Sequence, residues 1–292
     1  MSDPPIFAST AAVARHFRTL PELLAALAAL DVDGIELGFA PPLAGLDLPA
    51  GLARYPARFL VHNYFPAPEK PFVLNLASQD AATLRRSRDF AAAGLRLCAA
   101  LGAPFYSVHC GFLAEFDPGS LGRKLTYADV CDYERGYATF VASLRELLGV
   151  ARAAGLRLLV EPNVVAPFNL IDGRNPLLML AEPREFTRML AEVADDRLGV
   201  LLDLGHLNVT ATTLGFNREE FIATVAPAIG GFHLHDNDGT ADQHRPVAQG
   251  SWTLDVLRQP RFAGRPVVVE AKFDSAAALA EHCNRLKSLL NH

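Results

Sequence analysis

Eight short apolar segments recur along the chain, separated by longer stretches whose apolar residues repeat at helical spacing. The segments are rich in Val, Leu and Ile, as parallel strands are when both of their faces are buried. They occupy residues 6–9, 34–38, 58–62, 105–109, 156–161 and 198–203, a segment that begins at Gly231, and residues 266–270. Strands that alternate with helices in this way predict an α/β fold.

The number of segments indicates how the sheet closes. Eight strands in a chain of 292 residues favour a single closed (β/α)8 barrel, the TIM barrel, over an open doubly wound sheet. No GxGxxG motif follows the first segment, and the chain has neither a Walker loop nor a GxSxG elbow. No break in composition separates two halves, so we expect residues 1–292 to form one domain.

Helix signals lie between the strand segments. Ser78 or Asp80 is placed to cap the clearest helix, and Thr19 or Leu20 precedes another. Asn217 opens a capping-box pattern. We expect helices over residues 21–30, 78–101, 127–154, 183–194 and 276–290, and one after Asn217.

Composition narrows the compartment and the class of partner. The net charge of -5 gives no general attraction to nucleic acid, although a local basic patch leaves that partner open. The four cysteines lack CxxC spacing, which indicates reduced thiols in a cytoplasmic protein. Neither a secretion signal nor an apolar run of about 18 residues is present, so no membrane segment is expected. A homo-oligomer is compatible with this sequence.

An ionisable residue ends nearly every strand segment or follows it closely, and barrel enzymes place their chemistry at these C-terminal ends. Burying many carboxylates and imidazoles at one mouth is costly unless cations ligate them, and Glu161 and Glu270 in particular would repel each other. Mixed His and carboxylate sets suit zinc, iron or manganese. The predicted metal ligands are His62, His109, Glu161, Asp203, His206, His233, Asp242, His244 and Glu270.

Some of these residues also have an ordinary structural explanation. His62 and His109 can be strand-end histidines that bond to loop carbonyls. Asp203 and His206 can be a turn residue and a helix-start residue.

Other ionisable residues are expected to play supporting parts or none. We expect His235 to face inward and to hold a ligand in place, not to bind the ion itself. Glu36 is expected to do the same or to contact the substrate, with a polar residue at the barrel rim as the alternative. His16, His282 and His292 lie away from the strand ends and are expected at the surface.

From Glu36 to Glu270, this pattern resembles the xylose isomerase-like barrel superfamily, which includes sugar isomerases, sugar epimerases and type-IV apurinic/apyrimidinic endonucleases. The resemblance to the isomerase and epimerase branch implies one divalent ion, and the endonuclease branch implies a cluster of three. The positions that match the one-ion set are Glu161, Asp203, His233 and Glu270. The endonuclease set adds His62, His109, His206, Asp242 and His244.

Two segments depart from the endonuclease pattern. The usual Gly-Glu-Gly of that family is Ala248-Gln249-Gly250 here, and Asn63-Tyr64-Phe65-Pro66 stands where Ala-Pro-Tyr is more usual. Neither loop is rich in Lys or Arg, although phosphate contacts supply most of the affinity of a DNA binder. These departures favour the sugar branch.

Three functions follow as hypotheses. The first is an isomerase or epimerase for a small sugar or sugar phosphate, with one to three Zn²⁺ or Mn²⁺ ions per chain and with Glu161 and Glu270 as the acid–base pair around an enediolate. The second is a phosphodiesterase of the endonuclease type, and the third is a non-catalytic barrel that binds sugar or metal. Fold alone does not decide between them.

Overall fold

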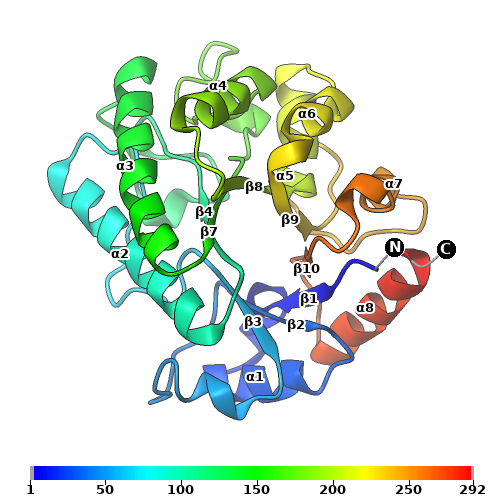
Figure 1. The fold of residues 1–292 in the computed structure, drawn as a ribbon. Helices are drawn as coiled ribbons and strands as arrows, with labels where there is room; N and C mark the ends of the chain where they lie inside the picture. The colour runs from blue at the N-terminus through cyan, green and yellow to red at the C-terminus, as the bar shows by residue number, and fades with distance from the viewer. Residues whose placement is uncertain (1–2, 291–292) are drawn as a thin grey trace.

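The structure is a computed structural model that describes residues 3–290. Its main strands are β1 Ile6–Ser9, β2 Gly34–Leu37, β3 Arg58–His62, β4 Phe105–His109, β7 Arg157–Glu161, β8 Leu198–Asp203, β9 Ile229–Leu234 and β10 Val267–Val269. These eight parallel strands close in the order β1-β10-β9-β8-β7-β4-β3-β2, and the helices surround them (Figure 1). The predicted TIM barrel is confirmed.

The inside of the barrel changes character along its axis. A buried cluster draws one side chain from each of six strands, and β1 and β7 are not neighbours in the sheet, so these side chains meet in the interior. The cluster consists of Phe7, Leu60, Phe105, Leu159, Leu201 and Val268. Because alternate residues of a strand share a face, the residues two positions further along also point inward. After Leu60, Leu159 and Leu201 those residues are His62, Glu161 and Asp203.

Side-chain caps set where several outer helices begin. Helix α1 (Leu20–Ala28) follows Thr19, α2 (Ala81–Leu101) follows Asp80, and α6 (Arg218–Val225) follows Asn217. Each of these three side chains accepts a hydrogen bond from a backbone N–H in the first turn of its helix, which satisfies a donor that the helix leaves open. The remaining long helices are α4 (Pro183–Val193) and α8 (Ala276–Leu290).

The prediction that a helix begins near residue 127 is wrong. Tyr127–Ala128 is strand β6, which pairs antiparallel with β5 (Glu115–Phe116) in a small hairpin. Helix α3 (Tyr133–Ala153) starts only after Asp132, whose carboxylate accepts hydrogen bonds from the backbone N–H groups of Glu134 and Arg135.

Two helices were not predicted from the sequence. Helix α5 (Leu204–Leu214) follows strand β8 without a loop, and α7 (Trp252–Leu257) is a short helix before β10. Between β2 and β3 the chain forms no α-helix and only the 3₁₀ turn Leu52–Arg54. No helix within residues 3–290 has both the length and the apolarity needed to cross a membrane.

The histidines expected at the surface differ in their surroundings. His16 is exposed, as predicted. His282 is buried, with its ring centroid 5.1 Å from that of Phe273, so the prediction for His282 is wrong. Helix α8 places it on the face that packs against the barrel. His292 lies outside the described residues.

Close packing of α2 against β4 depends on a glycine. A Cβ added at Gly94 would lie 2.4 Å from a ring carbon of the buried Tyr106, whereas one added at Gly149 in α3 would meet nothing within 4 Å. We expect Gly94→Ala to lower the free energy of unfolding by about 1–3 kcal/mol through overpacking. Gly149→Ala should raise it by roughly 0.5–1 kcal/mol, because alanine favours the helix.

Urea unfolding followed by circular dichroism measures both changes. If the two substitutions shifted the free energy of unfolding in the same direction, the proposed contact between α2 and β4 would be wrong.

Candidate metal centre

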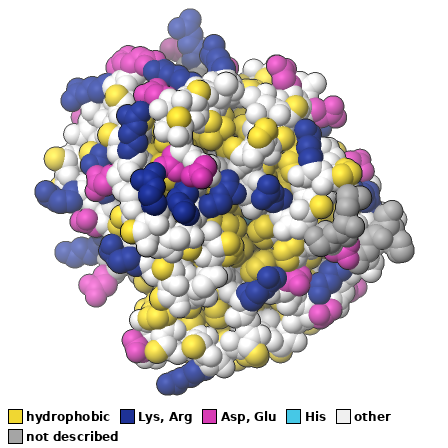
Figure 2. Space-filling model, viewed as in Figure 1, with side chains coloured by type: hydrophobic (Ala, Val, Ile, Leu, Met, Phe, Trp, Pro, Cys, Tyr) yellow, Lys and Arg dark blue, Asp and Glu magenta, His cyan; other side chains and the backbone are white. Residues whose placement is uncertain are grey.

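The structure brings all nine predicted ligands together at the C-terminal end of the barrel. Five of them end strands or lie within β9, and the others stand in the first turn of α5, in the loop after β9 and directly after β10. The side chains of Glu161, Asp203, His206 and His233 are buried. No histidine among the described residues is visible on the face drawn in Figure 2.

Glu161 lies at the centre of the group. One of its carboxylate oxygens is 3.2 Å from His62 Nε2 and 3.5 Å from His109 Nδ1. The other oxygen is 3.4 Å from His206 Nδ1 and 3.3 Å from His233 Nδ1. A single buried carboxylate therefore faces four imidazoles from four different elements.

Asp203 and Asp242 form a second part of the same group. Asp203 caps α5, since its Oδ1 accepts a hydrogen bond of 2.7 Å from the backbone N–H of His206. His235 Nε2 is 3.1 Å from Asp203 Oδ2 and 3.6 Å from Asp242 Oδ1. Asp242 Oδ2 is 2.9 Å from His244 Nε2 and 3.5 Å from His206 Nε2. The cap of α5 thus fixes one carboxylate of the centre.

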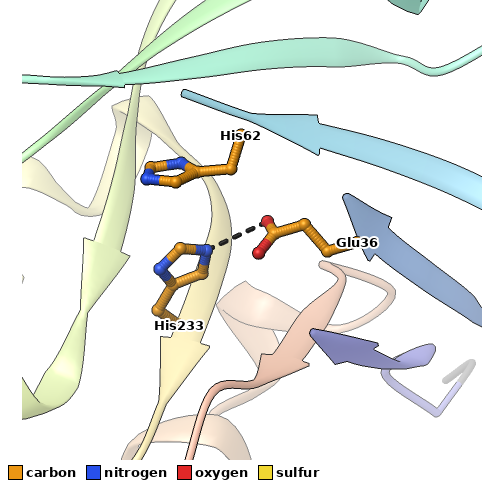
Figure 3. A group of neighbouring side chains, drawn as sticks. All are labelled: Glu36, His62 and His233. Atoms are coloured by element: carbon orange, nitrogen blue, oxygen red, sulfur yellow. Dashed lines mark hydrogen bonds and ion pairs between the residues drawn. The ribbon is translucent and has the colours of Figure 1, made fainter. Parts of the chain in front are cut away.

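Glu36 holds His233 in one orientation. Figure 3 shows Glu36, His62 and His233 pointing toward one another, with His233 Nε2 3.0 Å from Glu36 Oε2. His233 Nδ1 is left to face Glu161 and Glu270, at 3.3 Å from an oxygen of each. Glu36 is fully buried, so the alternative of a rim residue is wrong. A carboxylate that bonds the far nitrogen of a ligating histidine is a common support of metal sites.

Other imidazoles are oriented by partners that the sequence analysis did not include. His62 Nδ1 lies 2.9 Å from the hydroxyl of Ser107, and His206 Nδ1 lies 3.1 Å from the carbonyl of Pro162. His244 Nδ1 is 3.2 Å from the carbonyl of Glu270. Ser107 stands two residues before His109 on β4, so the two-residue period of a strand was a signal for it. These bonds turn the other ring nitrogen toward the centre.

The pKa values of the histidines in this group are shifted in opposite directions, downward by burial and upward by neighbouring carboxylates. Burial lowers the pKa of His62, and it lowers that of His109 to about 4. Burial also opposes a charge on His233, but Glu36, Glu270 and Glu161 raise its pKa well above the usual range. The site therefore stabilises positive charge at its centre.

Several buried polar atoms in the centre have no hydrogen-bond partner, and a bound cation would supply one. They include Glu161 Oε2, His233 Nδ1 and Asp242 Oδ1. Donor atoms that lie within 4.8 Å of one another form, among others, the sets His62, His109 and Glu161; Glu161, Asp203 and His233; and Asp203, His206 and His235. These imidazole and carboxylate donors fit zinc or manganese.

Comparison with known proteins agrees with the barrel fold. A family model described as xylose isomerase-like TIM barrel matches residues 24–289. A D-tagatose 3-epimerase-like protein has the same fold, with a TM-score of 0.72 and 17% identity over 98% of both chains. A protein from Thermus thermophilus, whose crystals were soaked with ZnCl₂, aligns with a TM-score of 0.60 and 23% identity over 98% of this chain and 97% of that one.

A sequence relative covers a smaller region. An uncharacterised protein of Methanocaldococcus jannaschii is 27% identical over 119 residues. That match spans 41% of this chain and 40% of the relative.

We expect at least two metal ions per chain, because the nine predicted ligands brought together here exceed the four that one zinc ion usually takes. His109→Ala should lower the ion content by about one while the set around Asp203 keeps its ion. Elemental mass spectrometry on protein purified without chelator measures the content. His16→Ala changes an exposed histidine that belongs to none of the donor sets, so it is the control and should leave the ion content unchanged. A single ion that survives His109→Ala would contradict the expectation.

Proposed function

The chain belongs to the xylose isomerase-like TIM barrel family, and we propose that it is a divalent-metal-dependent isomerase or epimerase of a small hydroxy-carbonyl compound, either a sugar or a compound with the same reacting group. The proposal depends on one observation. Two carboxylates, those of Glu161 and Glu270, lie on either side of His233 and line the same pocket. The shared fold of the D-tagatose 3-epimerase-like protein supports it.

Four residues would hold the ion that this reaction needs: Glu161, Asp203, His233 and Glu270. A bound Zn²⁺ or Mn²⁺ acts as a Lewis acid that polarises the carbonyl and stabilises the negative charge left by proton removal. Glu36 and His235 would act by position, since Glu36 orients His233 and His235 bonds Asp203. His62, His109, His206, Asp242 and His244 would bind further metal or orient the substrate.

Glu161 and Glu270 are the acid–base pair in this proposal. Burial raises the pKa of each carboxyl, but the neighbouring imidazoles lower it below the ordinary value, so both side chains are ionised and can accept a proton. One carboxylate takes the proton from the carbon beside the carbonyl. Return of a proton to the opposite face of that carbon gives an epimer, and return to the neighbouring carbon gives an isomer.

We expect Glu161→Gln and Glu270→Gln each to keep the fold and to lower turnover at least about a hundredfold, since each removes a proton acceptor. Incorporation of deuterium from D₂O into a panel of ketoses, followed by NMR, measures the proton transfer. Glu146→Gln in α3 removes an exposed carboxylate and serves as the control. Normal exchange in Glu161→Gln would refute the assignment.

A second candidate function is a phosphodiesterase of the type-IV endonuclease kind, which the meeting of all nine residues favours. Among the described residues that line the pocket there is no Lys or Arg to hold a phosphate backbone. We therefore expect no cleavage of an abasic-site oligonucleotide with zinc or manganese. Cleavage that His109→Ala abolished would establish this function in place of the first.

A further inference from the structure

A pocket of about 250 Å³ opens beside the metal centre. Its floor includes Glu161 and Glu270, and its walls come from the segment after β4 and from the loop after β7. Six large apolar side chains form what we call the apolar wall: Phe112, Phe116, Leu121, Leu125, Phe168 and Leu178. The volume is near the lower end for ligand pockets, so it suits a small molecule.

The amide nitrogens of the two asparagines among these walls are already bonded to the protein. That of Asn163 donates to the carbonyls of Gly111 and Met179. That of Asn169 donates to the carbonyl of Arg123, and the side-chain oxygen of Asn169 accepts from the backbone N–H of Leu125. A polyhydroxylated chain placed here would therefore replace few of the hydrogen bonds that it gives up to water, which is unfavourable.

The apolar wall is held in shape before any ligand binds. Phe112, Phe116 and Leu178 belong to a buried apolar cluster of their own, and the rings of Phe112 and Phe116 meet edge to face at 5.2 Å. Asn75 fixes Phe112 by bonding both its backbone N–H and its carbonyl. At the rim, Leu121 and Phe168 remain 37% and 41% exposed. A ligand that covered them would gain from the burial of apolar surface.

We propose that the substrate carries an unphosphorylated apolar body, alkyl or aryl, next to its hydroxy-carbonyl group. The hydroxy-carbonyl group rests on the proposed function, whereas the apolar body rests on the pocket. The hydroxy-carbonyl end lies at the metal centre and the apolar body fills the pocket. Sugars also stack one face on aromatic rings, but their hydroxyl edges need partners. Here Leu121, Leu125 and Leu178 complete the wall, and no described cation lines it.

Three hydroxamates test the pocket without depending on the reaction, because each chelates a divalent ion through the same head group. Acetohydroxamate has no tail, hexanohydroxamate has an alkyl tail, and gluconohydroxamate has a hydroxylated tail on a carbon chain of the same length. Their Kd values are measured by calorimetry on the Mn²⁺-loaded protein. We expect binding to tighten about fourfold for each methylene that becomes buried. Hexanohydroxamate should therefore bind at least about tenfold more tightly than either of the others.

Rim variants show whether this preference arises in the pocket. Leu121→Ser and Phe168→Ser should each weaken the binding of hexanohydroxamate by about fourfold or more, leave acetohydroxamate unchanged and keep the metal content. Val130→Ser is the control. It changes a side chain that is similarly exposed, 48%, but does not line the pocket. All three positions are exposed enough to keep the fold.

The outcomes separate the two proposals. Gluconohydroxamate binding as tightly as hexanohydroxamate, or equal losses in the rim and control variants, would overturn the apolar-body proposal whatever the deuterium exchange shows. A tail preference with no exchange on any hydroxy ketone, alkyl or sugar, would retain the apolar ligand and overturn the proposed reaction. A tail preference together with faster exchange on alkyl or aryl hydroxy ketones than on ketoses would support both.

Discussion

The organisation of this protein depends on the buried carboxylate of Glu161, which faces four imidazoles within 3.5 Å. A buried carboxylate is unfavourable unless positive charge or hydrogen bonds compensate it. The barrel supplies that compensation by closing, because His62, His109 and His233 stand on three other strands. Glu161 in turn keeps an oxygen without a hydrogen-bond donor. The same geometry that balances charge in the fold therefore leaves room for a cation.

The barrel could be predicted because its strands carry two signals in one segment. Each is a mostly buried apolar run, and in most of them the last inward residue is ionisable, as in Leu60 followed by His62 and Leu159 followed by Glu161. Helix α5 could not be predicted in this way. Its sequence contains three Thr residues and one Val, all of low helix propensity, and it begins directly after Asp203. Asp203 is the last residue of β8, the cap of α5 and a carboxylate of the site. The local sequence therefore gives no loop signal between the strand and the helix.

The candidate site was predictable to the extent that it lies on strands. Strand ends of a parallel barrel meet whatever the loops do, so the five residues on strands could be placed together without knowing any contact. The pocket beside them could not be predicted. Phe116 and Phe168 lie on different connections, one after β4 and the other after β7, and no sequence motif links them. Only the folded loops show that they share one cavity. Metal binding by these residues remains a prediction.

Glu161 and Glu270 differ in their exposure to solvent, and this difference bears on the part that each would play in the proposed reaction. The side chain of Glu161 is 1% exposed and is surrounded by imidazoles, whereas that of Glu270 is 15% exposed and also borders a hollow lined by Arg15 and Lys272. A proton taken up by Glu270 can therefore reach solvent more readily than one taken up by Glu161. In the proposed reaction, an apolar body against the apolar wall would exclude water from the reacting carbon and strengthen the local field of the carboxylates. Under the proposed reaction, Glu161 would keep its proton between removal and return, and Glu270 would exchange with the medium.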